Sequence, residues 1–251
     1  MIPIKSAREL ALIKEAGKLL GDILEAVQTQ VRPGATTGQL NDWIEQRIVQ
    51  GGGRPSFKGY RGFPAAACVS VNEEVVHGIP SYQRVLKEGD IVGIDVGTCM
   101  HGYHADAART YAVGEVSDLA KRLIESAKNG FFAGIARALA NGRIGDIGYA
   151  VQCAVERDGF SVVRALTGHG IGGNVHEEPD IPNYGRPGKG PRLRAGMVLA
   201  VEPMVNAGTC EVHMLSDGWT IVTADASLST HYENTIAVTE ESEPVILTLP
   251  E

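Results

Sequence analysis

Four acidic residues stand inside segments that otherwise have the composition of apolar strands. They are Asp95 in IVGIDVG, Asp106 in YHADAARTYAV, Glu202 in MVLAVEPMV and Glu233 in HYENTIAVT. A carboxylate in a buried strand loses its hydration, which costs several kcal/mol unless the group is paired or binds a metal. Few basic residues lie in these strands, so the four charges require positive charge from elsewhere. The pattern therefore predicts a bound cation.

Asp95 and Asp106 flank a tight turn at Met100-His-Gly102. A turn symmetric about Met100 and His101 places the two aspartates opposite each other across a hairpin, whereas a bulge at Gly102 shifts the register by one residue. Opposed aspartates repel each other, and a bound cation is the usual resolution.

His169 lies between glycines in GHGIGGNVHEEP, where backbone can approach its ring closely. A lone histidine is more often structural than a ligand, but four buried acids reverse those odds. One imidazole and four carboxylates form an oxygen-rich set that suits Mn, Fe or Co better than a structural zinc. Four negative charges also balance two divalent ions, which points to a two-metal hydrolytic site that shares a hydroxide.

Two similar helix hairpins are expected to position these residues. Ser6-Ala-Arg-Glu9 is a capping box that opens a helix running to the break at 32–34, and a second helix runs from about Thr37 to Gly51. Later, apolar residues at a step of four predict a helix over about 119–139, and another follows from about 146 to 159. Any two helix hairpins look alike, but the coincident breaks Arg32-Pro-Gly34 and Arg143-Ile-Gly145 favour an internal duplication.

Strand-like segments rich in Val, Ile, Thr and Tyr follow each helix pair. They are 65–71, 91–97 and 103–112 in the first half, and 162–167, 197–205, 210–214, 219–223 and 232–239 in the second. The predicted fold is α+β, a mostly antiparallel sheet with four long helices packed on one face. No linker divides the chain, so we expect a single domain over 1–251 made of two related halves, roughly 1–115 and 116–251.

The composition excludes several classes of protein. The chain has 251 residues, 43% hydrophobic, with a net charge of -7. No apolar run approaches the roughly 18–20 residues of a membrane helix, and the first residues lack the pattern of a secretion signal. Four cysteines are far apart and are expected to be reduced. The acidic balance argues against nucleic acid. We expect a cytoplasmic monomer with no membrane or nucleic-acid partner.

The segments HGYHADAART, GHGIGGNVHEEP, AVEPM and DGWTIVTADASLSTHYENT resemble the methionine aminopeptidases, specifically the bacterial type I form. The similarity covers nearly the whole chain and keeps the spacing of all five candidate ligands. It implies the duplicated pita-bread fold, in agreement with the repeated helix hairpin. It also implies a metalloexopeptidase that removes the initiator methionine from nascent polypeptides with a small second residue, and it leaves ribosome docking open.

The resemblance also implies a role for each ligand. Asp95, Asp106 and Glu233 would bind one divalent metal ion, and Asp106, His169, Glu202 and Glu233 would bind the other. Asp106 and Glu233 would then bridge the two ions. Glu202 would also shuttle the proton of the metal-bound hydroxide.

The substrate contacts follow from the same resemblance. His176 would hydrogen-bond the scissile carbonyl or its oxyanion, and His77 would contact the scissile amide nitrogen. The residues implied around the methionine side chain are Phe57, Tyr60, Phe63, Cys68, His77 and Trp219.

The chain departs from the family pattern at a few places. The helical insertion of type II enzymes between His169 and Glu202 is absent. We also expect no zinc-binding extension of the eukaryotic type I kind, since the sequence starts almost directly at the first helix. Val175 stands where relatives often have an aromatic residue, and Phe57 where many have cysteine, so the shape of the pocket is less defined than its metal site. His104 and His231 share the strand parity of Asp106 and Glu233, which leaves a supporting role open for both.

Two other functions are considered for this sequence. A prolidase or aminopeptidase P has the same fold and ligand set but usually carries an added N-terminal domain. A catalytically inactive pita-bread binding protein would lack some of the ligands, whereas all five are present here.

Overall fold

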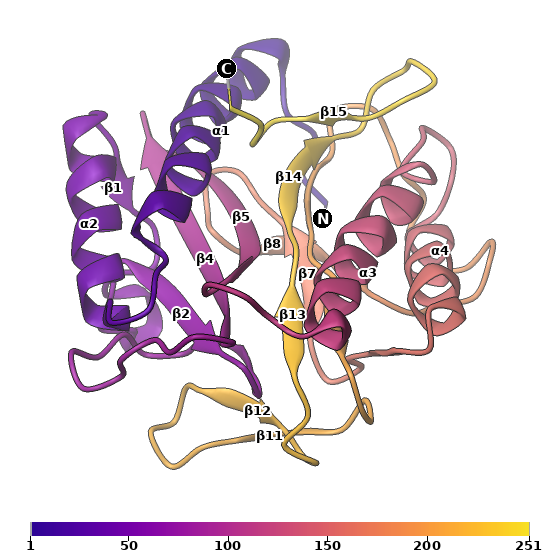
Figure 1. Ribbon diagram of the computed structural model, residues 1–251. Coiled ribbons are helices and arrows are strands. Elements are labelled where there is room, and N and C mark those ends of the chain that lie inside the picture. The colour runs from indigo at the N-terminus through magenta and orange to yellow at the C-terminus, as the bar shows by residue number, and fades with distance from the viewer. Residues whose placement is uncertain (1, 251) are drawn as a thin grey trace.

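Four long helices form two antiparallel pairs in the computed structural model, which describes residues 2–250 (Figure 1). The first pair is α1 (Ala7–Val27) and α2 (Thr37–Gln50), and the second is α3 (Asp118–Ile135) and α4 (Ile144–Arg157). The Ser6 hydroxyl accepts from the Glu9 N–H while the Glu9 carboxylate accepts from the Ser6 N–H, so the predicted capping box is confirmed. Within residues 2–250 no helix is both long and apolar enough to span a bilayer.

Each helix pair covers its own core. Leu20 of α1 and Ile44 of α2 are fully buried against β-strand residues of the first half, including Ile94. Phe131 of α3 and Ile147 of α4 are fully buried among residues of the second half. In the view of Figure 1, α1 and α2 lie to the left of β14, and α3 and α4 lie to its right.

The strands are antiparallel at every pairing, and they form four hydrogen-bonded sheets over residues 2–250 rather than one continuous sheet. The α+β prediction is confirmed. Short 3₁₀ turns lie at Gln28–Gln30 and Tyr60–Gly62. The strands are β1 Arg54–Pro55, β2 Ala67–Val71, β3 Glu74–Val76, β4 Ile91–Met100, β5 Tyr103–Ala112, β6 Ser161–Val162, β7 Thr167–Gly170, β8 Glu177–Pro182, β9 Val198–Val201, β10 Met204–Asn206, β11 Val212–Met214, β12 Ile221–Thr223, β13 Ser229–His231, β14 Asn234–Ala237 and β15 Val245–Ile246.

The hairpin of β4 and β5 has a different register from the symmetric one considered from the sequence. Met100 pairs with Tyr103, so Asp95 lies opposite Ala108 and Asp106 opposite Gly97. The direct opposition of the two aspartates is therefore wrong. The two turn residues, His101 and Gly102, have positive φ of 50° and 83°, the turn type that matches the twist of paired strands. The difference is two residues, and since side chains alternate with a period of two, both aspartates still project from the same face.

Glu202 and Glu233 lie at strand breaks, not within continuous strands as the sequence suggested. Glu202 separates β9 from β10, and Glu233 separates β13 from β14. Strands β9 and β14 belong to the five-stranded sheet, whereas β10 and β13 belong to a three-stranded one. Pro203 has no N–H for a ladder, which helps to end β9 at Val201 and to leave Glu202 outside the strand. The predicted strand over 162–167 is similarly divided between β6 and β7.

The two halves of the chain meet at Glu233. Its N–H donates to the carbonyl of Ala108 in β5, and the Ala108 N–H donates back to the Glu233 carbonyl, at 3.0 and 3.4 Å. The Asp106 N–H also donates to Thr235 Oγ1 of β14. These bonds hold the acidic residues of both halves beside one another. That the halves arose by duplication stays a prediction.

Candidate metal centre and substrate pocket

One pocket collects all the site residues named from the sequence. Carboxylates and one histidine from β4, β5, β7 and the two strand breaks form its floor, and aromatic side chains form its wall. The lining residues are Phe57, Tyr60, Arg61, Phe63, Cys68, His77, Asp95, Asp106, His169, His176, Glu202, Trp219 and Glu233. The structure thus brings the twelve predicted residues together, and their individual roles stay predictions.

The floor of the pocket has the spacing of a metal centre. His169 Nε2 lies 3.9 Å from Asp106 Oδ2 and 3.6 Å from Glu202 Oε1. The ligand atoms of Asp106, His169 and Glu233 all lie within 4.8 Å of one another, and all three residues are buried. Donor atoms bound to one ion at about 2.0–2.2 Å stand roughly 3–4 Å apart, so this donor set fits a divalent cation.

The carboxylates of the floor are poorly compensated by the protein itself. Burial raises the pKa of Asp95 to about 7. Burial, followed by the neighbouring carboxylates, raises the pKa values of Asp106, Glu202 and Glu233 well above their usual range. One oxygen each of Asp95, Asp106 and Glu233 is buried without a hydrogen-bond partner within residues 2–250. Orphaned acceptors with raised pKa values are what a bound cation would satisfy.

Two glycines allow His169 to reach the floor. A Cβ at Gly168 would lie 2.3 Å from the Ala200 carbonyl oxygen, and one at Gly170 would lie 2.2 Å from the Glu178 carbonyl oxygen. The close approach expected from the sequence is confirmed. His169 Nδ1 lies 2.9 Å from the Gly170 carbonyl oxygen, which can only accept. Nδ1 therefore carries the proton, and Nε2 offers a lone pair toward Asp106 and Glu202.

Aromatic rings form the wall of the pocket. Trp219 meets the rings of Phe63 and His77 edge to face, with centroids 5.1 and 6.3 Å apart. Phe57 belongs to the same apolar cluster, and a Cβ at Gly97 would lie only 2.7 Å from its ring. Val175 packs in the same cluster, is 3% exposed, and is not among the residues that line the pocket. Phe57 and Val175, the two departures from the family pattern, therefore belong to the same apolar cluster in the wall.

His176 stands between the wall and the floor. Its ring stacks on Tyr60 at 5.3 Å and lies 4.1 Å from the ring of His169. Burial lowers the pKa of His176 to about 3, helped by electrostatic repulsion between its protonated form and His169, Arg61 and His77, so the ring is neutral near pH 7. Tyr60 Oη lies 3.1 Å from Nδ1. A hydroxyl that donates to Nδ1 leaves the proton on Nε2, free to donate to a substrate.

His77 is held in an unusual backbone conformation. Its φ is 59°, in the left-handed region that side chains other than glycine rarely adopt. Burial lowers the pKa of His77, which keeps the ring neutral as well.

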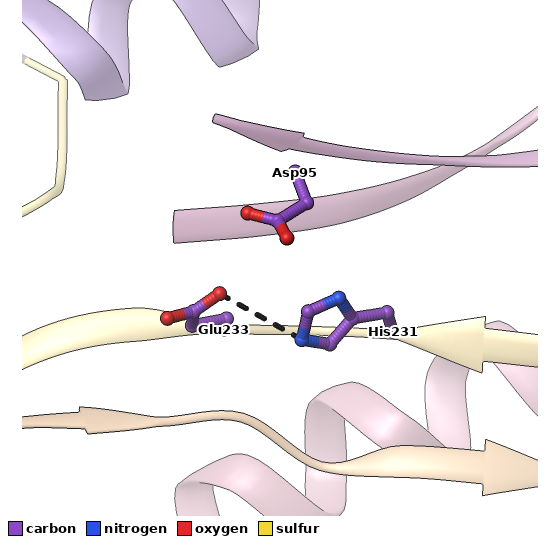
Figure 2. Close-up of side chains that lie close together, drawn as sticks. All are labelled: Asp95, His231 and Glu233. Carbon is purple, nitrogen blue, oxygen red and sulfur yellow. Dashed lines mark ion pairs between the residues drawn. The ribbon is translucent and has the colours of Figure 1, made fainter. Parts of the chain in front are cut away.

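The structure adds two residues to those named for the pocket. Arg61 lines it, with its guanidinium 5.3 Å from the centre of the Tyr60 ring. Nothing in the sequence marked Arg61, because its position depends on a φ of 50° within an irregular loop. His231 lies beside Asp95 and Glu233 (Figure 2), and its strand parity with Glu233 was the only signal.

A buried carboxylate–imidazole cluster on this fold agrees with the comparisons with known proteins. The model of metallopeptidase family M24 matches residues 11–240, and the chain belongs to this family. A methionine aminopeptidase of Clostridium perfringens is 53% identical, over 99% of both chains. The crystal structure of a methionine aminopeptidase from Thermotoga maritima superposes with a TM-score of 0.97 at 44% identity, over 99% of this chain and 100% of the other. These findings confirm the resemblance and the fold predicted from the sequence.

A more distant likeness concerns the fold alone. A prolidase from Pyrococcus furiosus superposes with a TM-score of 0.80 at 20% identity, and the match spans 99% of this chain but 66% of the prolidase.

Proposed function

We propose that this chain is a metal-dependent aminopeptidase that removes the initiator methionine from nascent polypeptides whose second residue is small. The observation that carries the proposal is that one pocket is lined both by the carboxylate–histidine floor and by the aromatic wall. The floor supplies the chemistry of peptide hydrolysis, and the wall supplies a site for one apolar side chain. The similarity to methionine aminopeptidases over the full length of both chains supports the same assignment.

Five residues would hold two divalent ions. Asp95, Asp106 and Glu233 would serve one ion, and His169 and Glu202 would join the shared pair Asp106 and Glu233 at the other. When bound, such ions supply positive charge that compensates the carboxylates, polarises a carbonyl and lowers the pKa of water. The orphaned oxygens on both sides of the cluster support the presence of two ions rather than one.

Three protein groups would then act on the substrate. Glu202, whose side chain is 13% exposed, would take the proton of the attacking water and return it to the leaving amine. The Nε2–H of His176 would donate to the carbonyl oxygen, with a bond that strengthens as negative charge develops there. His77 would contact the scissile amide nitrogen.

The wall explains a preference for methionine. Phe63, Trp219 and Phe57 present ring edges and faces to one side of the pocket. A thioether is unbranched and polarisable, so it can lie along aromatic edges. Leucine is similar in volume but branched, and an apolar pocket discriminates by only about 1–3 kcal/mol per misplaced group. Cleavage after leucine is therefore expected to be slower but measurable.

The partners follow from the substrate. Nascent peptide N-termini arise in the cytoplasm, where we place the reaction, and transient docking on the ribosome would bring the pocket to them. All twelve predicted pocket residues come from one chain, so a monomer is sufficient.

Four peptides test the proposal. Metal-stripped protein is reloaded with Co, Mn, Fe or Zn and assayed on Met-Ala-Ser, Leu-Ala-Ser, Arg-Pro-Ser and acetylated Met-Ala-Ser. We expect Met-Ala-Ser to be cleaved well above Leu-Ala-Ser, and only with metal. The acetylated peptide should not be cleaved, because acetylation blocks the free amine that would lie beside the Asp95-side ion. Efficient cleavage of Arg-Pro-Ser with no preference for methionine would instead identify a prolidase or an aminopeptidase P.

A further inference from the structure

His231 is a buried imidazole that points into the metal floor. It ends β13, two residues before Glu233, and its side chain is 4% exposed. Its Nε2 lies 3.7 Å from Glu202 Oε2 and 3.7 Å from Glu233 Oε2. Figure 2 shows the ring beside the carboxylates of Asp95 and Glu233, and the ligand atoms of these three residues all lie within 4.8 Å of one another.

These distances separate two possible roles. At 3.7 Å, Nε2 is too far from either carboxylate for a hydrogen bond, and no atom within residues 2–250 partners it. Leaving a buried ring nitrogen unpaired is unfavourable, because the group has lost its hydration and gained no partner in return. Two donor atoms on one ion, however, stand roughly 3–4 Å apart. The spacing fits a shared ion and does not fit a direct contact.

His231 has the same relation to one side of the floor that His169 has to the other. His169 Nε2 lies 3.6 and 3.9 Å from its nearest carboxylate oxygens, and both rings are more than nine-tenths buried at the side chain. His169 forms a possible ligand group with Asp106 and Glu233, and His231 forms one with Asp95 and Glu233. Glu233 is common to both groups.

The backbone around His231 fixes its position. The His231 N–H donates to Thr110 Oγ1, and the Thr110 hydroxyl donates to the His231 carbonyl, both at 3.0 Å. The nearby guanidinium of Arg109 donates to the carbonyl oxygens of Ala108 and Glu233 and to the side chain of Asn234. The Arg109 guanidinium is therefore hydrogen-bonded to backbone and amide oxygens and not to the carboxylates. The carboxylates beside His231 still lack a compensating cation.

We propose that His231 is a sixth metal ligand, bound through Nε2 to the Asp95-side ion, so that each of the two ions has one imidazole. The inference rests on the two-metal function proposed above and extends its five-residue ligand set. A nitrogen donor on the Asp95 side would favour ions that accept imidazole, such as Zn, Co, Fe or Ni, over Mg and Ca.

Zinc binding followed by NMR of histidine ring nitrogens tests the proposal directly. Zinc has no unpaired electrons, and a coordinated imidazole nitrogen shifts strongly from its free position. Protein labelled with ¹⁵N-histidine is loaded with two equivalents of zinc. We expect two metal-shifted imidazoles in the unaltered protein, one in His231→Gln and one in His169→Gln. The matched control is His104→Gln, which removes another buried histidine, hydrogen-bonded to Ser56, and should keep both signals.

Calorimetric titration with zinc gives a second readout. Supporting residues behind a ligand already change metal affinity by about 10- to 100-fold, so the loss of a ligand should weaken one binding event by at least that factor. His231→Gln retains hydrogen-bonding groups and similar bulk, and would preserve affinity if His231 only positioned its neighbours. We expect Gln and Ala substitutions to weaken the same single event and to leave the other unchanged.

The outcomes separate this proposal from the one it rests on. A single metal-shifted imidazole in the unaltered protein, retained in His231→Gln, would overturn the sixth ligand even if Met-Ala-Ser is cleaved. Wild-type affinity for both ions in His231→Gln would do the same. Absence of zinc binding in the unaltered protein would overturn both proposals.

Discussion

The two sides of the pocket are built from different kinds of backbone. The floor residues Asp95, Asp106 and His169 lie on paired strands, and Glu233 is bonded on both backbone groups to β5. The wall comes largely from the irregular segment 56–66 and from residues at strand ends. Five residues of the wall segments adopt positive φ, namely Gly59, Arg61, Gly62, His77 and Gly218. Paired strands thus hold the carboxylates and the histidine of the floor, and loops form the wall that would bind the substrate side chain.

This difference predicts that mutations will separate into two kinds. Changes in the floor should act on metal binding and on the rate, since its side chains share ions and cannot be replaced by neighbours. Changes in the wall should act on the choice of substrate, since an apolar surface discriminates by small increments. The predictions below test that separation.

The largest effect is expected from the shared ligands of the floor. Asp106→Ala should abolish cleavage of Met-Ala-Ser and weaken the binding of both ions, because Asp106 would serve each of them. Asp95→Ala should mainly weaken one ion. Calorimetric titration with Co or Mn measures this, and two unaltered binding events in Asp106→Ala would contradict a shared site.

Glu202→Gln should slow the reaction while leaving the wall intact. Loss of a general base typically reduces the rate about 100- to 10,000-fold. The Michaelis constant for Met-Ala-Ser and the preference over Leu-Ala-Ser should change little, because the methionine side chain would contact the wall. Steady-state kinetics with both peptides measures this. The control is Glu211→Gln, which changes an exposed carboxylate directly before β11. An unchanged rate would rule out Glu202 as the base.

In the metal-free protein, the free energy of unfolding should depend on pH because the carboxyl groups of the floor titrate. The pKa of Asp95 is raised to about 7 by burial, above its ordinary value of 3.8. A raised carboxyl pKa means that the folded protein holds more protons than the unfolded one between these values, so stability falls as pH rises through that interval. The metal-free protein should therefore lose several degrees in Tm between pH 5 and pH 8, and saturating metal should reverse the loss.

Thermal unfolding at a series of pH values, with and without metal, tests this dependence. Asp95→Asn removes one of the titrating groups and should flatten the metal-free profile. A Tm that rises with pH in the metal-free protein would contradict the uncompensated floor.

The sequence predicted the floor better than the strands that carry it. Acids in apolar segments signal buried charge whatever the register. Asp95 and Asp106 could therefore be identified although the register of their hairpin was left open, and although the observed pairing differs by two residues from the symmetric one. A shift of two residues in strand pairing leaves every side chain on the same face of the sheet. The two aspartates therefore still lie on one face, as the metal site requires. The breaks at Glu202 and Glu233 were missed because a chain that passes between two sheets keeps an apolar composition on both sides.

The wall could be named only through the resemblance to a family. Its shape depends on left-handed residues such as Arg61 and His77, and neither residue type signals positive φ in a sequence. His231 illustrates the limit in the floor. Its parity with Glu233 was visible, but its distance from Glu202 depends on the pairing of β13 with β10, which brings His231 opposite Met204.

The smallest effect is expected from the wall, at Trp219. Its indole meets Phe63 and His77 edge to face, so Trp219→Ala would open the wall without touching the floor. The ratio of kcat/KM for Met-Ala-Ser over Leu-Ala-Ser should fall by about 10- to 200-fold, the range for one misplaced apolar group. Zinc affinity should stay unchanged. The control is Trp43→Ala. It removes the chain's other tryptophan, which lies on α2 and does not line the pocket, and it should leave the ratio intact. If Trp219→Ala instead weakened zinc binding and preserved the ratio, wall and floor would not be separable, because loop packing would then hold the ligands in place.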